Sequence, residues 1–218
     1  MKKIIAMLLA LVMVLSLAAC ASTQPAAEPA ASSGAPAESG KTYTVGVCQL
    51  VQHEALDAAT QGFVDALKEA LGDAVTIDVQ NASGDSVNCG TIVNGFVAKG
   101  VDLIMANATP ALTAAVSATA DIPILGTSIT AYGVALDIDD FSGTVGGNIS
   151  GTSDLADLQK QAQMILDWFP ETKTVGLLFC SAEPNSRYQI DELRKALEAQ
   201  GVTCEEFAFT DSNDVSSV

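Results

Sequence analysis

His53 is the single histidine of the chain and stands four residues before Asp57. On a helix this spacing places an imidazole and a carboxylate on one face, as in half of a metal site or in a general-base pair. Neither a third metal ligand nor a nucleophilic Ser or Cys stands at a matching spacing. We therefore expect His53 to shape a loop or to contact a ligand, and we predict no catalytic residue, no metal and no cofactor.

Polar residues gather where the predicted strands end, in residues 49–57, 106–110, 126–130 and 180–186. Ligands of open parallel sheets bind beyond the carboxyl ends of the strands, where loops lead into helix N-termini that attract carboxylates. These segments offer hydroxyl, amide and backbone N–H donors, and Arg187 is the only basic side chain near them. Neither G-x-G-x-x-G after the first strand nor a Walker A motif is present, which argues against a nucleotide-dependent enzyme.

An alternation of short β-rich runs and amphipathic helical patterns must position these groups. The predicted strands are residues 42–50, 75–79, 101–106, 122–125, 173–180 and 202–209. Gly72, Gly100 and Gly201 are expected to end the helices that follow three of the strands. Regular βαβα alternation predicts an α/β fold with parallel sheets covered by helices on both faces.

Helix starts are expected at three of the strand-to-helix turns. Asp85 or Ser86 fits the N-cap of the second helix, and Thr109 fits an N-cap because a proline follows it. Asn185 or Ser186 fits the N-cap of the helix after the strand at 173–180.

The stretch 126–153 is rich in Gly and Ser and too long for one helix, so it divides four βα units from a second series. A helix is expected to start near Ser153 and Asp154. Its apolar face contains Leu155, Leu158, Ala162, Ile165 and Phe169. We predict two Rossmann-like lobes, the first over residues 42–150, followed by a crossover and the truncated start of the second lobe over residues 151–218.

The N-terminus has the order of a secretory signal over residues 1–20: two lysines, an apolar stretch too short for a good membrane span, and small residues up to Cys20. Its last four residues, Leu-Ala-Ala-Cys, resemble a bacterial lipobox, in which Cys20 is lipidated and becomes the mature N-terminus. The alternative is an ordinary signal peptide with an incidental cysteine. Residues 21–41 are Pro, Ala, Ser and Gly with almost no large apolar side chain, which predicts a disordered tether.

The charge limits which partners the protein can bind, and the cysteine spacing argues against a zinc site. Ten Lys and Arg stand against 26 Asp and Glu, for a net charge of −16, so the surface repels nucleic acid and anionic headgroups. Four cysteines besides Cys20 lack zinc-site spacing. We expect buried thiols, although an exported protein permits a disulfide. These four are Cys48, Cys89, Cys180 and Cys204.

A family resemblance rests on five blocks taken together. They are QHEALDAATQGFVDALKEAL (52–71), QNASGD (80–85), ATPAL (108–112), GGNISGTSD (146–154) and VGLLFCSAEPNS (175–186). In order and spacing they resemble the ABC-transporter solute-binding lipoproteins of the tryptophan/tyrosine-binding type. The resemblance implies a periplasmic-binding-protein type I fold, in which two lobes close on an amino acid, usually an aromatic one, and deliver it to a membrane permease and its ATPase.

The resemblance also implies the ligand contacts. The first lobe would supply Gln49, His53, Thr109, Thr127 and Ser128. The crossover would supply Ser153 and Asp154, and the second lobe Glu183, Asn185 and Ser186. The chain departs from the family pattern at Glu54 and Ala131, which puts the side-chain specificity in question.

Three functions compete at this stage. The first is a lipid-anchored extracytoplasmic receptor for import, without enzymatic activity or a nucleic-acid partner. The second is a sensory domain that binds the same ligand and signals to a membrane partner. The third is an exported hydrolase, which would require a nucleophile–base pair that the sequence does not contain.

Overall fold

The computed structural model describes residues 40–210 and 212–218. The expected signal peptide, Cys20 and nearly all of the expected tether lie outside the described residues. The strands are β1 (Tyr43–Gln49), β2 (Val75–Asn81), β3 (Leu103–Asn107), β4 (Ile124–Ile129), β5 (Ile149–Ser153), β6 (Thr174–Cys180) and β7 (Thr203–Phe209). The helices are α2 (Glu54–Leu71), α3 (Ser86–Lys99), α4 (Thr109–Ala118), α5 (Tyr132–Ala135), α6 (Leu158–Trp168) and α7 (Pro184–Glu198), with 3-10 turns at Gly72–Ala74 and Ser212–Asp214.

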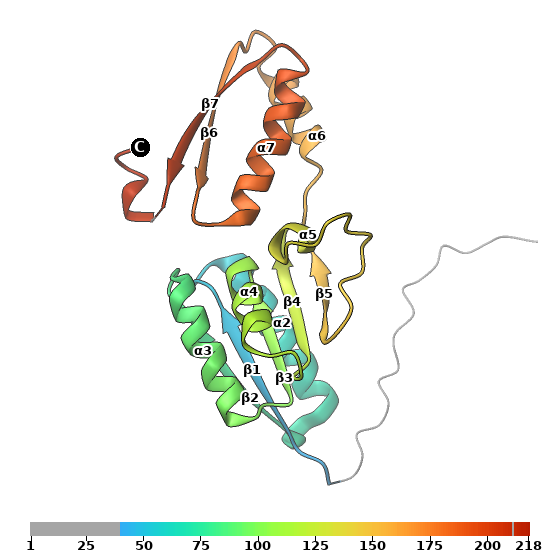
Figure 1. Ribbon diagram of the computed structural model, residues 1–218. Coiled ribbons are helices and arrows are strands. Elements are labelled where there is room, and N and C mark those ends of the chain that lie inside the picture. Colours follow the sequence, from blue (N-terminus) through green and yellow to red (C-terminus); the bar gives the residue numbers. More distant parts are fainter. Residues whose placement is uncertain (1–39, 211) are drawn as a thin grey trace, which may run out of the picture. The chain divides into compact units, whose positions relative to one another are not determined.

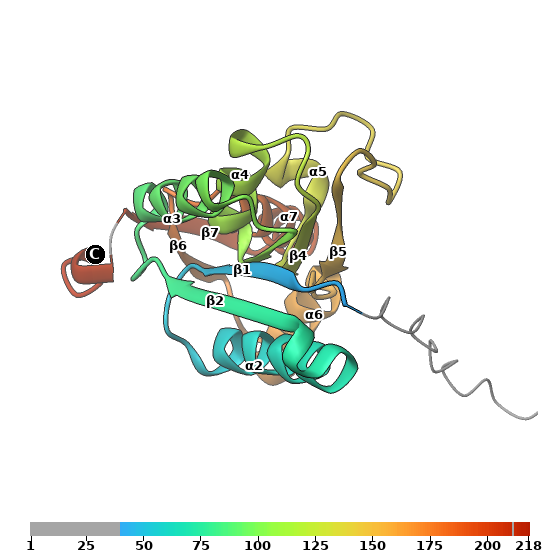
Figure 2. The same ribbon diagram turned by 90° about the horizontal axis from the view of Figure 1, so that it is seen from below.

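A parallel sheet in the order β2-β1-β3-β4-β5 organises the first lobe, residues 43–153 (Figure 1). Helix α2 covers one face, and α3 and α4 cover the other (Figure 2). Strand β1 is apolar on both faces and lies inside the sheet, whereas β2 alternates between half-buried and exposed residues, as suits an edge strand. Because all the strands run in one direction, their carboxyl ends meet at the same edge.

The core of the first lobe is packed tightly where β1 meets α3. A Cβ atom built on Gly46 would lie 2.5 Å from the ring of Phe96, which is completely buried. Only a residue without a side chain lets this helix approach the strand so closely. The approach fixes which turn of α3 lies over β1.

Two features of the stretch 126–153 differ from the prediction. It contains the short helix α5 and the strand β5, so the first sheet has one strand more than expected and the expected lobe boundary at residue 150 falls within β5. A Cβ atom on Gly151 would lie 2.7 Å from the amide nitrogen of Gly126 and closer still to its carbonyl oxygen. This glycine therefore allows β5 to pair with β4.

Helix α6 starts later than expected. Its N-cap is Asp157, whose carboxylate accepts a hydrogen bond of 3.1 Å from the Lys160 amide, so the expected start near Ser153 and Asp154 is wrong. Both residues belong to the end of β5 and to the segment after it. Consequently Leu155 is 41% exposed and does not join the apolar face of the helix.

The second lobe contains the parallel pair β6–β7, aligned from Thr174–Thr203 to Cys180–Phe209. Helices α6 and α7 pack against Leu177 and Phe179 on one face of this pair. In the part of the chain that the structure describes, Leu178 and Phe207 on the other face are exposed.

Candidate functional site

Four of the five residues predicted for the first lobe lie at the carboxyl edge of its sheet. Gln49 ends β1, Thr109 begins α4 after β3, and Thr127 and Ser128 belong to the last part of β4. His53 precedes α2 and is its N-cap, with Nδ1 accepting a hydrogen bond of 3.2 Å from the Ala55 amide. His53 therefore shapes the start of α2, one of the two roles expected for it, and its contact with a ligand stays a prediction.

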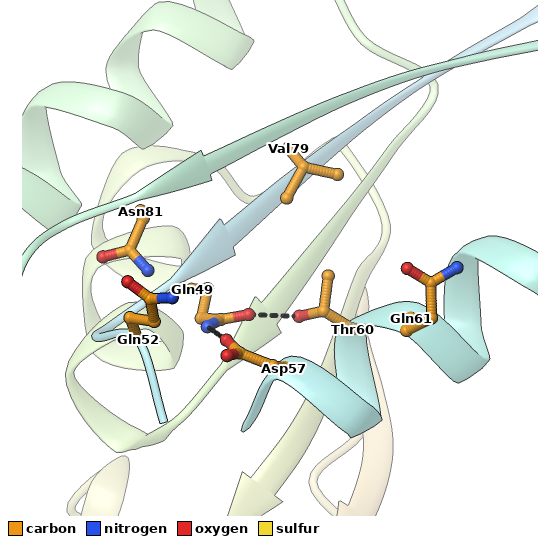
Figure 3. Close-up of a pocket in the computed structure, with 7 residues that line it drawn as sticks. All are labelled: Gln49, Gln52, Asp57, Thr60, Gln61, Val79 and Asn81. Atoms are coloured by element: carbon orange, nitrogen blue, oxygen red, sulfur yellow. Dashed lines mark hydrogen bonds between the residues drawn. The ribbon is translucent and has the colours of Figure 1, made fainter. Parts of the chain in front are cut away.

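A network of hydrogen bonds holds Gln49 in one orientation. Its Nε2 donates to Asp57 Oδ1 at 2.6 Å, and its Oε1 accepts from the Thr60 hydroxyl at 2.6 Å (Figure 3). The same Nε2 also donates to the carbonyl oxygen of Val51 at 2.8 Å. Gln49 is 4% exposed, and its bond to Thr60 is buried, whereas its bonds to Asp57 and Val51 are partly buried. They join the end of β1 to the first two turns of α2.

Asn107, the last residue of β3, extends this network and was missed by the sequence prediction. Its Nδ2 donates to the carbonyl oxygen of Leu56 at 2.8 Å and to Thr60 Oγ1 at 2.9 Å. Because the carbonyl of Leu56 can only accept, the amide orientation of Asn107 is fixed. Its Oδ1 is buried and has no hydrogen-bond partner among the described residues.

A second buried acceptor lies two residues further on. The hydroxyl of Thr109 has no partner in the described part of the chain, and the residue is 2% exposed. The expected N-cap role of Thr109 is wrong by one position, because Ala108 is the N-cap and adopts a φ of 88°. Thr109 is the first helical residue instead, so its side chain is not used for capping.

Strand β4 is irregular where the predicted contacts Thr127 and Ser128 lie. Ser128 has a φ of 56°, a left-handed conformation that is uncommon for a residue with a side chain, and the pairing of β4 with β5 shifts register there. Thr127 is the register partner of Asn107 on the neighbouring strand. Backbone irregularities of this kind are frequent beside binding sites.

Two cavities adjoin this edge. The one drawn in Figure 3 has a volume of about 340 Å³. It is lined by Gln49, Gln52, Asp57, Thr60, Gln61, Val79 and Asn81. A second cavity of about 310 Å³ is more apolar, with Phe63, Met105, Leu125 and Thr127 among its lining residues. Polar amides and an apolar surface therefore occur within one part of the first lobe.

The crossover residues lie at the same edge, with Ser153 at the end of β5 and Asp154 directly after it. The Ser153 hydroxyl donates to the carbonyl oxygen of Thr130 at 2.9 Å, and the Asp154 amide donates to the carbonyl oxygen of Ile129 at 3.1 Å. Burial raises the pKa of the Tyr132 phenol, and the negative charge of Asp154 raises it further. The two hydrogen bonds hold the crossover residues against the end of β4 and the residue after it.

The predicted residues of the second lobe form one turn after β6. Glu183 is the N-cap of α7, so the expectation that Asn185 or Ser186 caps this helix is wrong. The Glu183 carboxylate accepts from Ser186 Oγ at 3.2 Å and from Asn185 Nδ2 at 3.4 Å. Asn185 Oδ1 is buried and finds no partner within the described ranges.

Arg187, the basic residue nearest to this turn, is already paired. It lies 2.7 Å from Glu206 and 2.6 Å from Asp191, and its guanidinium stacks on the Phe179 ring at 4.6 Å. Two carboxylates satisfy its charge. A ligand carboxylate at this turn would therefore be bound by N–H and O–H donors rather than by this cation.

The described residues contain no group of three or more His, Cys, Asp and Glu side chains that could hold a metal ion. Among them, no helix combines the length and apolarity needed to cross a membrane. What the site offers is oriented amides, hydroxyls and buried acceptors at strand ends. Such an arrangement can bind a small polar ligand.

Comparison with known structures defines the class of the fold. The chain is similar to the structure of an ABC domain from Streptococcus pneumoniae in complex with L-Trp, with 36% identity, a TM-score of 0.75, and coverage of 81% of this chain and 60% of that one. A leucine-binding protein from Thermotoga maritima shares the fold at 13% identity and a TM-score of 0.59. The fold is that of a type I periplasmic-binding protein, as predicted.

The family follows from the sequence. Residues 44–218 match the family model of ABC transporter substrate binding proteins, and the chain belongs to this family. It is 34% identical over 185 residues to a tyrosine-binding protein of Clostridioides difficile (strain R20291), covering 82% of this chain and 52% of that protein. The chain thus spans about half the length of that relative. The family consists of solute-binding proteins and not of enzymes.

Proposed function

We propose that the protein is the extracytoplasmic solute-binding component of an ABC importer. Its ligand would be an amino acid with an aromatic side chain. Support comes from the two relatives above, one solved in complex with L-Trp and the other called a tyrosine-binding protein. A permease and its ATPase would receive the ligand. The observation that carries the proposal is a set of buried acceptors without a partner in the described residues, namely Asn107 Oδ1 at the end of β3 and Thr109 Oγ1 and Asn185 Oδ1 at the starts of α4 and α7.

The carboxylate and the ammonium group of an amino acid would be bound by different groups of the protein. Hydroxyls and free amides at the starts of α4 and α7 would bind the carboxylate, since a helix N-terminus favours an anion. Carboxylates and amide oxygens would bind the ammonium group. The contacts we propose are Gln49, His53, Thr109, Thr127 and Ser128 in the first lobe, Ser153 and Asp154 in the crossover, and Glu183, Asn185 and Ser186 in the second lobe.

A thermal-shift screen of the full-length protein against the twenty amino acids tests this function. A ligand that binds only the folded protein stabilises it, by about 2.7 kcal/mol at a concentration of 100 times Kd. We expect L-tyrosine, L-tryptophan or L-phenylalanine to raise the melting temperature most. Stabilisation by a sugar or a carboxylic acid and by none of the amino acids would contradict the proposal.

Anchoring through Cys20 is a separate part of the proposal. Lipidation of this residue would fix the receptor to the membrane, with residues 21–41 as a tether. Cys20→Ala should then yield protein without a lipid, either uncleaved or released. Mass spectrometry of the mature N-terminus and membrane fractionation measure this directly, and a wild-type N-terminus without lipid mass would disprove the anchor.

A further inference from the structure

Two of the four described cysteines lie in the core of the first lobe. Cys48 belongs to β1 and Cys89 to α3, and both are completely buried in the same apolar cluster. No disulfide joins any of the described cysteines. The binding residues proposed above do not include either thiol.

The packing of α3 on β1 brings these two thiols together. Gly46 faces Phe96, and Cys48 lies on the same face of β1, about 6.6 Å further along the strand. Helix α3 runs opposite to the strand and places Cys89, Val93 and Phe96 on one side, with Cys89 about 10.5 Å beyond Phe96. Cys48 is therefore level with the turn between Val93 and Cys89.

The electrostatics of the pair agree with this placement. A hydrogen bond between the two thiols raises the pKa of Cys48 and lowers the pKa of Cys89. A hydrogen bond between two thiols requires the two sulfurs to lie in contact.

The other two cysteines cannot form an equivalent pair. Cys204 is aligned with Val175, whereas Cys180 is aligned with Phe209, five residues further along the same two strands. At about 3.3 Å per residue they lie roughly 16 Å apart, beyond the 7 Å limit between the Cα atoms of a disulfide. Cys204 packs in the core of the second lobe, which is separate from the cluster that holds Cys48 and Cys89.

We propose that Cys48 and Cys89 form a disulfide in the exported protein, made during folding by an extracytoplasmic thiol–disulfide oxidant. The thiolate of one cysteine attacks the oxidant's disulfide and releases one of its thiols as a mixed disulfide forms. The other cysteine then attacks the sulfur of the first, which releases the second oxidant thiol. The two cysteines lose two electrons and two protons, and the oxidant gains both. Exchange must precede the packing of α3, because both sulfurs are inaccessible afterwards.

This crosslink would stabilise two loops of the binding edge. Cys48 directly precedes Gln49, and Cys89 lies one turn beyond the N-cap Asp85. The disulfide closes the chain over residues 49–88, which reduces the freedom of the unfolded state. We expect the melting temperature of the oxidised protein to exceed that of the reduced protein by roughly 5–15 °C.

Differential alkylation of the full-length protein tests the proposal. Protein exported to an oxidising compartment is unfolded in guanidinium with iodoacetamide, then reduced, labelled with N-ethylmaleimide and mapped by mass spectrometry. We expect N-ethylmaleimide on Cys48 and Cys89 and iodoacetamide on Cys180 and Cys204. Iodoacetamide on Cys48 and Cys89, both after export and after refolding with oxidised glutathione, would overturn the proposal.

Two variants separate the crosslink from simple packing. Cys89→Ser should leave Cys48 open to iodoacetamide and should melt near the temperature of reduced wild type, without a further effect of reductant. Cys204→Ser should retain the crosslink and the shift on reduction. A wild-type melting temperature that does not respond to reductant would show that no disulfide contributes to stability.

Discussion

Gln49 Nε2 lies 2.6 Å from Asp57 Oδ1, and this bond fastens the end of β1 to the first turn of α2. Thr60 and Asn107 continue the network to the end of β3. Two central strands of the sheet are thus tied to one helix by side chains that are mostly buried. The edge at which we place the ligand is thereby held in shape before any ligand binds.

The first prediction concerns Asn107. Asn107→Leu removes both Nδ2 hydrogen bonds, so the carbonyl oxygen of Leu56 loses its side-chain donor and the Thr60 hydroxyl keeps only its bond to Gln49 Oε1. We expect the free energy of unfolding, measured by urea titration, to fall by about 1–3 kcal/mol. Gln61→Ala is the control, because its bond to Asp65 is exposed and should contribute less than about 0.5 kcal/mol. If both variants have the same free energy of unfolding, the hydrogen bonds of Asn107 do not contribute to stability.

The second prediction concerns the contact between Gly46 and Phe96. Gly46→Ala would place a methyl group against the Phe96 ring, and overpacking of this kind costs about 1–3 kcal/mol. Gly62→Ala is the matched substitution on the exposed part of α2, where a Cβ atom meets nothing within 4 Å among the described atoms. It should stabilise the helix by about 0.5–1 kcal/mol. Thermal unfolding of both variants tests whether their effects have opposite signs.

The alternation of strands and helices could be predicted from the sequence because apolar periodicity and caps such as Asp85 are local signals. Strand β5 could not, since the sequence ISGTS is short and polar, and it forms a strand only because Gly151 lets it approach β4. Asn107 was missed for a similar reason. It ends an apolar run, and its importance depends on Leu56 and Thr60, about fifty residues earlier in the chain.

The N-cap roles expected for three of the predicted site residues were wrong. Thr109, Asn185 and Ser186 were expected to cap helices, but Ala108 and Glu183 occupy the cap positions. Both helices carry a proline in the first turn, and the N-cap lies one residue earlier than expected in α4 and two or three residues earlier in α7. The error matters, because a side chain that does not cap is available to a ligand.

The third prediction concerns acid stability. Arg187 and then Arg194 lower the pKa of Glu206 to about 2 in the folded protein. Because this pKa is below the unfolded value of about 4.3, the interaction stabilises the fold above that pH and is lost as the pH falls toward 2. We expect the melting temperature to fall less between pH 4.5 and 2 in Glu206→Gln than in wild type. Glu205→Gln, whose carboxylate has no ion pair within the described residues, should follow the wild-type curve.

The last prediction concerns Asn185, which lies at the second helical position of α7 with its Oδ1 buried and unpaired in the described part of the chain. If this oxygen binds the ammonium group of an amino acid, Asn185→Ala in the full-length protein should weaken L-tyrosine binding by about 1.5–3 kcal/mol, as for hydrogen bonds to charged groups. Its structural bond to Glu183 is long, at 3.4 Å, so the melting temperature without ligand should change little. Gln200→Ala removes an equally long bond at the other end of the same helix and should leave affinity unchanged. Calorimetric titration of both variants measures the dissociation constants. An unaltered dissociation constant for Asn185→Ala would show that Asn185 does not contact the ligand.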